Sequence, residues 1–130
     1  MNLIKKKIYY HDTDCGGVVY YANYLKYFEE ARTEFFADKN IDMLELSKQG
    51  ILFVVKDVNI CYKKPAFYGQ VVRVKTKLTK IKAASLQFLH FIEVEKSLLV
   101  SAETRLACIN KSFRACTIPE DILAKLKNVL

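Results

Sequence analysis

The residues of this chain that are able to do chemistry gather near its start, between positions 10 and 21. One imidazole, two carboxylates and one thiol lie within five consecutive positions, as His11, Asp12, Asp14 and Cys15. A glycine pair, Gly16 and Gly17, follows and supplies the backbone angles of a tight turn. The start of a helix comes next along the chain. A reactive side chain, a turn and the free N–H groups of a helix start are most of what an acyl-transfer site needs.

Three interpretations compete for these side chains. His11 and Cys15 are spaced like a cysteine–histidine pair, and with the two acids they offer a set of metal ligands. Both hypotheses are disfavoured, because the segment passes from a strand into a turn and the other histidine of the chain, His90, lies far along it in a predicted strand. Asp14 remains open: it is a nucleophile or general base, or a turn residue whose carboxylate accepts a backbone hydrogen bond.

A long amphipathic helix is predicted to begin at Asn23 and to end near residues 38–40. Its apolar side chains recur at steps of three and four residues: they are Tyr24, Tyr27, Phe28, Ala31, Phe35 and Phe36. On the same helix Glu29 and Arg32 are spaced for an i,i+3 ion pair.

Strands are predicted at residues 3–11, 51–62, 71–82, 85–95 and 98–110, where β-branched and aromatic residues are frequent. The short connections between the later runs indicate hairpins in an antiparallel sheet. Residues 41–49 predict a short helix that stops at Gly50, and Pro119 is expected to start a last helix with an apolar side of Ile122, Leu123, Leu126 and Val129 or Leu130. This order predicts an α+β fold in which a curved antiparallel sheet wraps around one long central helix.

The chain has 130 residues, which predicts a single domain over residues 1–130. Its net charge of +7 favours anionic partners such as nucleic acid, a membrane surface or a phosphate-bearing small molecule. We expect a cytoplasmic protein without a transmembrane segment, since no long apolar run or signal sequence is visible. The four cysteines form no C-x-x-C pair, so free thiols are predicted, with Cys61 and Cys108 in the core.

The sequence resembles acyl-CoA thioesterases of the hot-dog fold, within the 4-hydroxybenzoyl-CoA thioesterase superfamily and nearest to the YbgC type. The residues that carry the resemblance are the run YYHDTDCGGVVYYANY at positions 9–24, continued on the helix by FEEARTE at positions 28–34. Phe53, Tyr62, Pro65 and the segments 79–81 and 85–86 extend it over nearly the whole chain. The chain departs from many YbgC-type sequences at His11 and at Tyr21, so the role of the family histidine is not transferred to Tyr21.

The resemblance implies hydrolysis of acyl-CoA thioesters without a metal or other cofactor. It makes Asp14 the catalytic carboxylate, the Tyr21 backbone N–H the oxyanion donor, and Gly16 and Gly17 the turn of the site. His11 and Glu29 are expected near the substrate, and another branch of these thioesterases takes its carboxylate from the central helix, where Glu29 lies. CoA phosphates are assigned to Lys80 and Lys82, although a solvated strand face explains these lysines equally well. Assembly into a dimer or tetramer is implied, with the site at an interface.

Two rival functions are compatible with the sequence. The first is a thioesterase that prefers acyl carrier protein to CoA. The second is a basic, non-catalytic module that binds nucleic acid or an anionic membrane. We disfavour the second, because the lysines are dispersed and no nucleic-acid-binding motif is visible. The preferred acyl group cannot be read from the residues.

Overall fold

The computed structural model describes residues 1–128 of the chain. Its elements, in chain order, are β1 (Asn2–Lys7), the 3-10 helix η1 (Tyr10–Asp12), α1 (Asn23–Asp38), α2 (Met43–Lys48), β2 (Leu52–Tyr62), β3 (Val71–Ile81), β4 (Ser85–Val94), β5 (Ser97–Ile109) and α3 (Glu120–Lys127). The predicted helices and the four later strands are confirmed to within a few residues.

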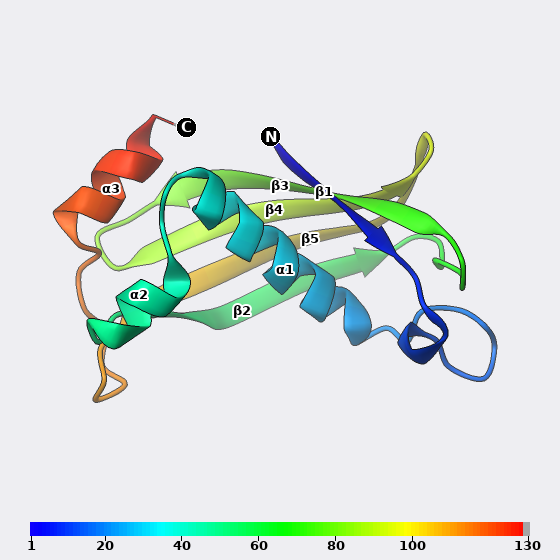
Figure 1. Cartoon of the computed structure of the whole chain (residues 1–130), viewed down its shortest axis with the longest axis horizontal. Coiled ribbons are helices and arrows are strands. Elements are labelled where there is room, and N and C mark those ends of the chain that lie inside the picture. Colours follow the sequence, from blue (N-terminus) through cyan, green and yellow to red (C-terminus); the bar gives the residue numbers. More distant parts are fainter. Residues whose placement is uncertain (129–130) are drawn as a thin grey trace.

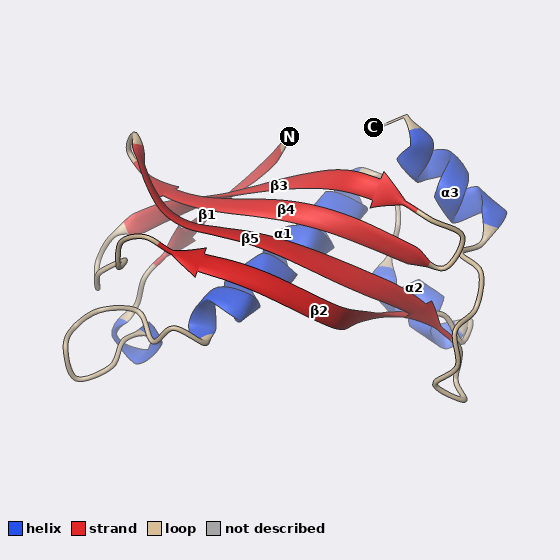
Figure 2. Ribbon diagram, turned by 180° about the vertical axis from the view of Figure 1, so that it is seen from behind, coloured by secondary structure: helices blue, strands red, loops and turns tan. Residues whose placement is uncertain are grey.

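The five strands form one antiparallel sheet in the order β1-β3-β4-β5-β2. Helix α1 crosses one face of this sheet, and α2 and α3 lie at the end where β2 begins and β3 finishes (Figures 1 and 2). The other face carries no helix within the described residues. The predicted architecture, an antiparallel sheet around one long helix, is confirmed. Strand β2 is an edge strand of 11 residues.

The core lies between α1 and the inner face of the sheet, which is the face that α1 covers. Predicted alternation in β3 is confirmed, because Val72, Val74, Thr76 and Leu78 are all at most 1% exposed. In β4 the buried positions Leu86, Phe88, His90 and Ile92 face the same way. Along α1 the buried residues are Tyr24, Tyr27, Phe28, Ala31, Arg32, Phe35 and Phe36, which confirms the predicted apolar stripe and adds one arginine to it.

Truncation of the central aromatic of this core should be costly. Phe28 is 1% exposed and stacks on the His90 ring at a centroid distance of 4.8 Å. We expect Phe28→Ala to lower the free energy of unfolding by about 3–5 kcal/mol, because it leaves a cavity under the helix. Leu44→Ala on α2 is the control, since Leu44 is 66% exposed and should cost no more than about 0.5 kcal/mol. Urea titration measures both; equal losses would contradict this description of the core.

Two sequence predictions about strands were wrong. The first strand was expected to reach residue 11 but ends at Lys7, because the buried Asp12 carboxylate accepts the Tyr9 N–H at 2.8 Å and closes the turn of η1. Cys61 was expected in the core but is exposed, since it pairs with Ser101 on the outer face of the sheet. Cys108 is buried as predicted.

The C-terminal helix packs its apolar side onto the end of the core, where Ile122 and Leu126 are 3% and 0% exposed. Leu123 packs against the same cluster, while the predicted contributions of Val129 and Leu130 lie outside the described residues. Among the helices of residues 1–128, none has the length and apolarity to cross a membrane.

Candidate active site

The segment between β1 and α1 is held in place by backbone hydrogen bonds on both sides. The Asp12 carbonyl accepts from the Tyr20 N–H at 3.0 Å and from the Asn23 side-chain amide at 2.8 Å, which ties η1 to the start of α1. On the other side the Val19 N–H donates to the Ala66 carbonyl at 2.9 Å. A loop anchored in this way can hold a reactive side chain in a fixed position.

Asp14 lies on the exposed part of this loop, at the start of the predicted turn. Its Oδ1 accepts the Gly16 N–H at 2.9 Å, and its carbonyl accepts the Gly17 N–H at 3.1 Å. Gly17 has a φ of +77°, a conformation that side chains with a Cβ rarely adopt. Asp14 is therefore an Asx-turn residue in this conformation, with its Oδ2 left without a hydrogen-bond donor among residues 1–128. The turn role and the catalytic role of Asp14 are compatible. Its Oδ1 accepts the Gly16 N–H and fixes the carboxylate, while its Oδ2 stays available to a substrate or a water.

The two glycines of the turn should respond differently to an added methyl group. Gly17→Ala is expected to lower the free energy of unfolding by about 1–2 kcal/mol through its left-handed backbone, and to lower kcat by displacing Asp14. A Cβ at Gly16 would lie 3.4 Å from Asp14 Oδ1, an ordinary contact, so Gly16→Ala should cost less stability. Denaturant titration and initial rates compare the pair; a Gly17→Ala variant as stable and active as wild type would contradict the turn's proposed importance.

Tyr21, just before the start of α1, is one of the residues that line a shallow cavity. The cavity has a volume of about 280 Å³ and is lined by Val19, Tyr21, Tyr24, Tyr62, Lys63, Lys64 and Pro65. The Tyr62 hydroxyl donates to the Tyr21 carbonyl at 3.2 Å, which joins the end of β2 to the helix start. Within residues 1–128 the Tyr21 N–H has no backbone acceptor, as expected for a residue just before a helix. An anionic oxygen is the natural occupant of such a position.

The competing cysteine–histidine and metal hypotheses receive no support from the geometry. His11 is exposed, stacks on Tyr9 at a centroid distance of 5.9 Å and directs Nδ1 toward Asp12 Oδ1 at 3.8 Å. No hydrogen bond joins it to Cys15 among the described residues. Over residues 1–128 no three side chains from histidine, cysteine, aspartate and glutamate come together as metal ligands.

A second polar group, which sequence reasoning missed, is buried under the middle of α1. Arg32 donates from Nη1 to Nε2 of His90 at 3.4 Å, and Nδ1 of His90 contacts the Thr76 hydroxyl at 3.2 Å. Because arginine is always a donor, His90 Nε2 accepts and Nδ1–H donates to Thr76. The available sequence signal was the placement of His90 between Phe88 and Ile92 on the buried face of β4.

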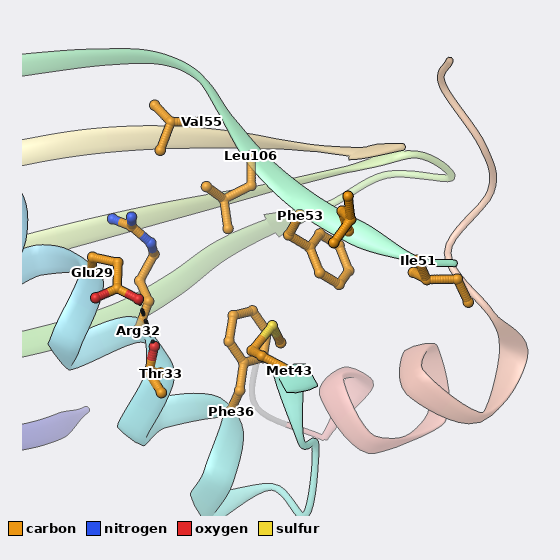
Figure 3. A pocket seen from close by; sticks show the side chains of 10 residues that line it. Glu29, Arg32, Thr33, Phe36, Met43, Ile51, Phe53, Val55 and Leu106 are labelled. Atoms are coloured by element: carbon orange, nitrogen blue, oxygen red, sulfur yellow. Dashed lines mark hydrogen bonds between the residues drawn. The ribbon is translucent and has the colours of Figure 1, made fainter. Parts of the chain in front are cut away.

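The predicted ion pair between Glu29 and Arg32 was wrong. Glu29 accepts the Thr33 hydroxyl at 3.1 Å, while Arg32 turns inward to His90, and within residues 1–128 no carboxylate is in ion-pair distance of the guanidinium. The two side chains nevertheless line one cavity of about 260 Å³ between α1, α2, β2 and β5 (Figure 3). Neither Asp14 nor Tyr21 lines that cavity.

Comparison with known proteins identifies the family to which this site belongs. A family model described as the thioesterase-like superfamily matches residues 9–126, which include the turn and the central helix. The chain belongs to this superfamily. The acyl-CoA thioester hydrolase YbgC of Escherichia coli O6:H1 is 32% identical over 93% of this chain and 92% of its own length.

Solved structures agree with this assignment. The hypothetical protein TT1821 of Thermus thermophilus superposes with a TM-score of 0.95 at 32% identity, over 100% of both chains. A DHNA-CoA thioesterase of Staphylococcus aureus superposes with a TM-score of 0.91 at 29% identity, over 98% of this chain and 91% of its own. The resemblance to hot-dog thioesterases noted from the sequence is therefore confirmed, as is the fold.

In this member of the superfamily, the lysines assigned to CoA lie far from the Asp14 loop of the same chain. Lys80 is near the end of β3 and Lys82 is in the turn that follows, and both are exposed. Figures 1 and 2 place that turn beside α3, at the opposite end of the sheet from the loop that holds Asp14. A contact of these lysines with CoA at the Asp14 loop would require a second chain.

Acid should destabilise this thioesterase through His90. Burial, and secondarily the charge of Arg32, lowers the pKa of His90 to about 3 from 6.5. Below pH 6.5 the unfolded chain takes up a proton at this histidine that the native chain does not, so stability is lost as the pH falls toward 3. Between pH 6.5 and 3 we expect His90 to lower the free energy of unfolding by up to about 1.4 kcal/mol per pH unit. The His90→Gln variant should lack this pH-dependent loss. Urea titrations at several pH values measure the free energy of unfolding of the wild-type and His90→Gln proteins. If both lose stability equally as the pH falls, His90 is not the cause.

Proposed function

We propose that this protein hydrolyses acyl-CoA thioesters to a free acid and CoA, with Asp14 as the catalytic carboxylate. The observation that carries the proposal is the glycine turn, which fixes one Asp14 oxygen by the Gly16 N–H and leaves the other available. The same anchored loop leads to the unpaired Tyr21 N–H at the start of α1. Membership of the thioesterase-like superfamily, and the activities named for its YbgC relatives, support the same chemistry.

The reaction divides the work between these two groups. Asp14 attacks the thioester carbonyl to form an anhydride that water then cleaves, or it removes a proton from the attacking water. In both routes the carbonyl oxygen becomes negative and the Tyr21 N–H stabilises it, an interaction worth about 3 kcal/mol for a well-placed donor. The thiolate of CoA leaves and is protonated. A single turnover in ¹⁸O-labelled water detects an anhydride that water cleaves at the Asp14 carbonyl, because the product then keeps an unlabelled Asp14 oxygen and Asp14 gains the label.

Self-association completes the proposal, and the edge strand β2 supports it. On the inner face of β2, Val55 and Val58 pair with the buried Leu106 and Thr104, yet they are 51% and 37% exposed because α1 does not cover them. An uncovered apolar face beside an unpaired strand edge favours binding of a second copy. The occupant that we propose is another chain of this protein, joined through β2 in a symmetric dimer. A tetramer would need further contacts.

Symmetric pairing of β2 would bring two different parts of the site together. Within one chain, the Tyr62 end of β2 lies against Tyr21, while the Leu52 and Phe53 end lines the cavity that holds Arg32. If two β2 strands pair in antiparallel fashion about their centres, the Tyr62 end of one copy meets the Leu52 end of the other. The Asp14 loop of one copy would then face the Arg32 cavity of its partner, so each site would use both chains.

The assay that tests the function is a panel of short, long and aromatic acyl-CoAs, with release of the CoA thiol as the measured product. We expect turnover of at least one acyl class well above the enzyme-free rate. No thiol release from any of them would contradict the proposal. Matched acyl carrier protein thioesters, assayed in parallel, decide whether CoA or carrier protein is the preferred thiol. A cytoplasmic site of action stays a prediction.

A further inference from the structure

The cavity between α1 and β2 contains a buried cation that no residue of the described chain neutralises. Arg32 is 8% exposed and uses Nη1 for His90, which is neutral, so its charge is not compensated there. Figure 3 shows its side chain extending from α1 into the cavity, beside Glu29 and below Val55. A guanidinium carries five N–H donors, and most of those of Arg32 remain free to meet a ligand.

An unpaired buried cation is energetically unfavourable. Burial lowers the pKa of Arg32 below its usual value, and only the more distant Glu29 charge opposes this. Glu29 is exposed and its carboxylate is held by Thr33, so it does not serve as the missing partner. Buried charges in folded proteins are normally paired. The missing partner is therefore an anion that the described chain does not supply.

The walls of the cavity limit what kind of anion this is. Phe36 and Phe53 stack at a centroid distance of 5.8 Å, and Leu106 and Met43 complete an apolar lining. Such walls suit methylene groups, while the guanidinium at one side suits a carboxylate. The cavity volume of about 260 Å³ leaves room for a short chain and excludes a nucleotide.

We propose that this cavity binds the far end of an acyl group that carries a terminal carboxylate, so that the substrates are CoA half-thioesters of dicarboxylic acids. The inference rests on the proposed function and on the paired β2 strands, which place the cavity beside the Asp14 loop of the other copy. The thioester lies at Asp14 and Tyr21 of one chain, the methylene groups lie against Phe36, Phe53 and Leu106 of its partner, and the carboxylate meets Arg32. Arg32 thereby selects the substrate and takes no part in bond cleavage.

Matched substrates test this directly. Adipoyl-CoA and hexanoyl-CoA, or suberyl-CoA and octanoyl-CoA, have equal carbon counts and differ in the terminal carboxylate. We expect wild type to favour the carboxylated member in kcat/KM by about tenfold or more, and Arg32→Met to reduce that ratio by about 10- to 100-fold. Arg105→Met is the control, since Arg105 pairs with Asp57 on the outer face of the sheet, and its ratio should equal that of wild type.

Inhibition of the wild-type protein covers the case in which Arg32→Met does not fold. Free adipate should inhibit hexanoyl-CoA hydrolysis at roughly tenfold lower concentration than 1,6-hexanediol does, because the diol has the same chain length and no carboxylate. Arg32→Lys, which keeps the charge without the fork of donors, should give an intermediate substrate ratio. Equal inhibition by adipate and the diol, or a wild-type substrate ratio near one, would overturn the inference. So would an Arg32→Met variant that changes assembly without changing the substrate ratio. If any of these contrary results is found while hexanoyl-CoA is still hydrolysed, the proposed thioesterase function stands and only the dicarboxylate inference fails. If no acyl-CoA is hydrolysed, both the proposed function and the inference fail.

Discussion

Replacement of Asp14 by asparagine is expected to lower kcat for acyl-CoA hydrolysis by about 10²–10⁴-fold, with little change in stability. Asparagine can still accept the Gly16 N–H through its side-chain oxygen, so the turn should persist. What it loses is the negative oxygen that attacks the carbonyl or accepts a proton from water. The change should therefore appear in kcat far more than in KM.

Asp12→Asn is the matched control, since it removes the second carboxylate of the same loop. Asp12 is 5% exposed and its carboxylate accepts the Tyr9 N–H, so its function is to hold η1. Asparagine can still accept the Tyr9 N–H, but it buries an amide donor where a carboxylate oxygen stood, so we expect a loss of about 1–3 kcal/mol in the free energy of unfolding. The kcat per folded molecule should far exceed that of Asp14→Asn. Equal loss of kcat in both variants, or full activity in Asp14→Asn, would remove Asp14 from its proposed role.

Substitution of Val58 by aspartate is expected to have the second largest effect, because it places a charge on the inner face of β2 where the partner copy is proposed to bind. Burial of an unpaired charge in an interface costs several kcal/mol. The variant should therefore be a monomer at micromolar concentration. Because each site would then lack its partner's cavity, turnover should fall by about 100-fold or more. Light scattering measures the mass, and thiol release measures the rate.

Val54→Asp provides the comparison for this variant. Val54 lies on the same edge strand with nearly the same exposure, 38% against 37%, but it pairs with Ala107 and faces the outer side of the sheet. We expect it to remain associated and active. A wild-type protein that is monomeric and active, or a Val58→Asp variant that is monomeric with full turnover, would show that one chain suffices for the reaction.

Local patterns in the sequence predicted most of the fold, and the two errors have physical reasons. The stripe from Tyr24 to Phe36 and the alternation in β3 are properties of neighbouring residues, so they can be read without a structure. Cys61 was misplaced because an apolar run does not reveal which of its residues face inward; the register with Ser101 decides that. The first strand was predicted too long because the hydrogen bond from the Tyr9 N–H to the Asp12 carboxylate depends on a side-chain conformation that the sequence does not reveal.

The part of the candidate site formed by neighbours in the sequence could be predicted. The part formed by residues that are far apart in the sequence could not. Asp14, Gly16 and Gly17 form the expected turn, and their catalytic assignment stays a prediction. Arg32 and His90 are 58 positions apart, so no local pattern joins them. The position of Lys80 and Lys82 relative to Asp14 depends on the length of β3, which carries them to the other end of the sheet.

The most direct test of the central claim measures both products of one reaction with the wild-type protein. CoA thiol and free acid are quantified together from the acyl-CoA that turns over fastest, with enzyme-free and Asp14→Asn reactions alongside. We expect the wild-type protein to form equal amounts of thiol and acid, and we expect Asp14→Asn to form both at close to the enzyme-free rate. Thiol released without free acid, or equal product formation by both proteins, would contradict hydrolysis at Asp14.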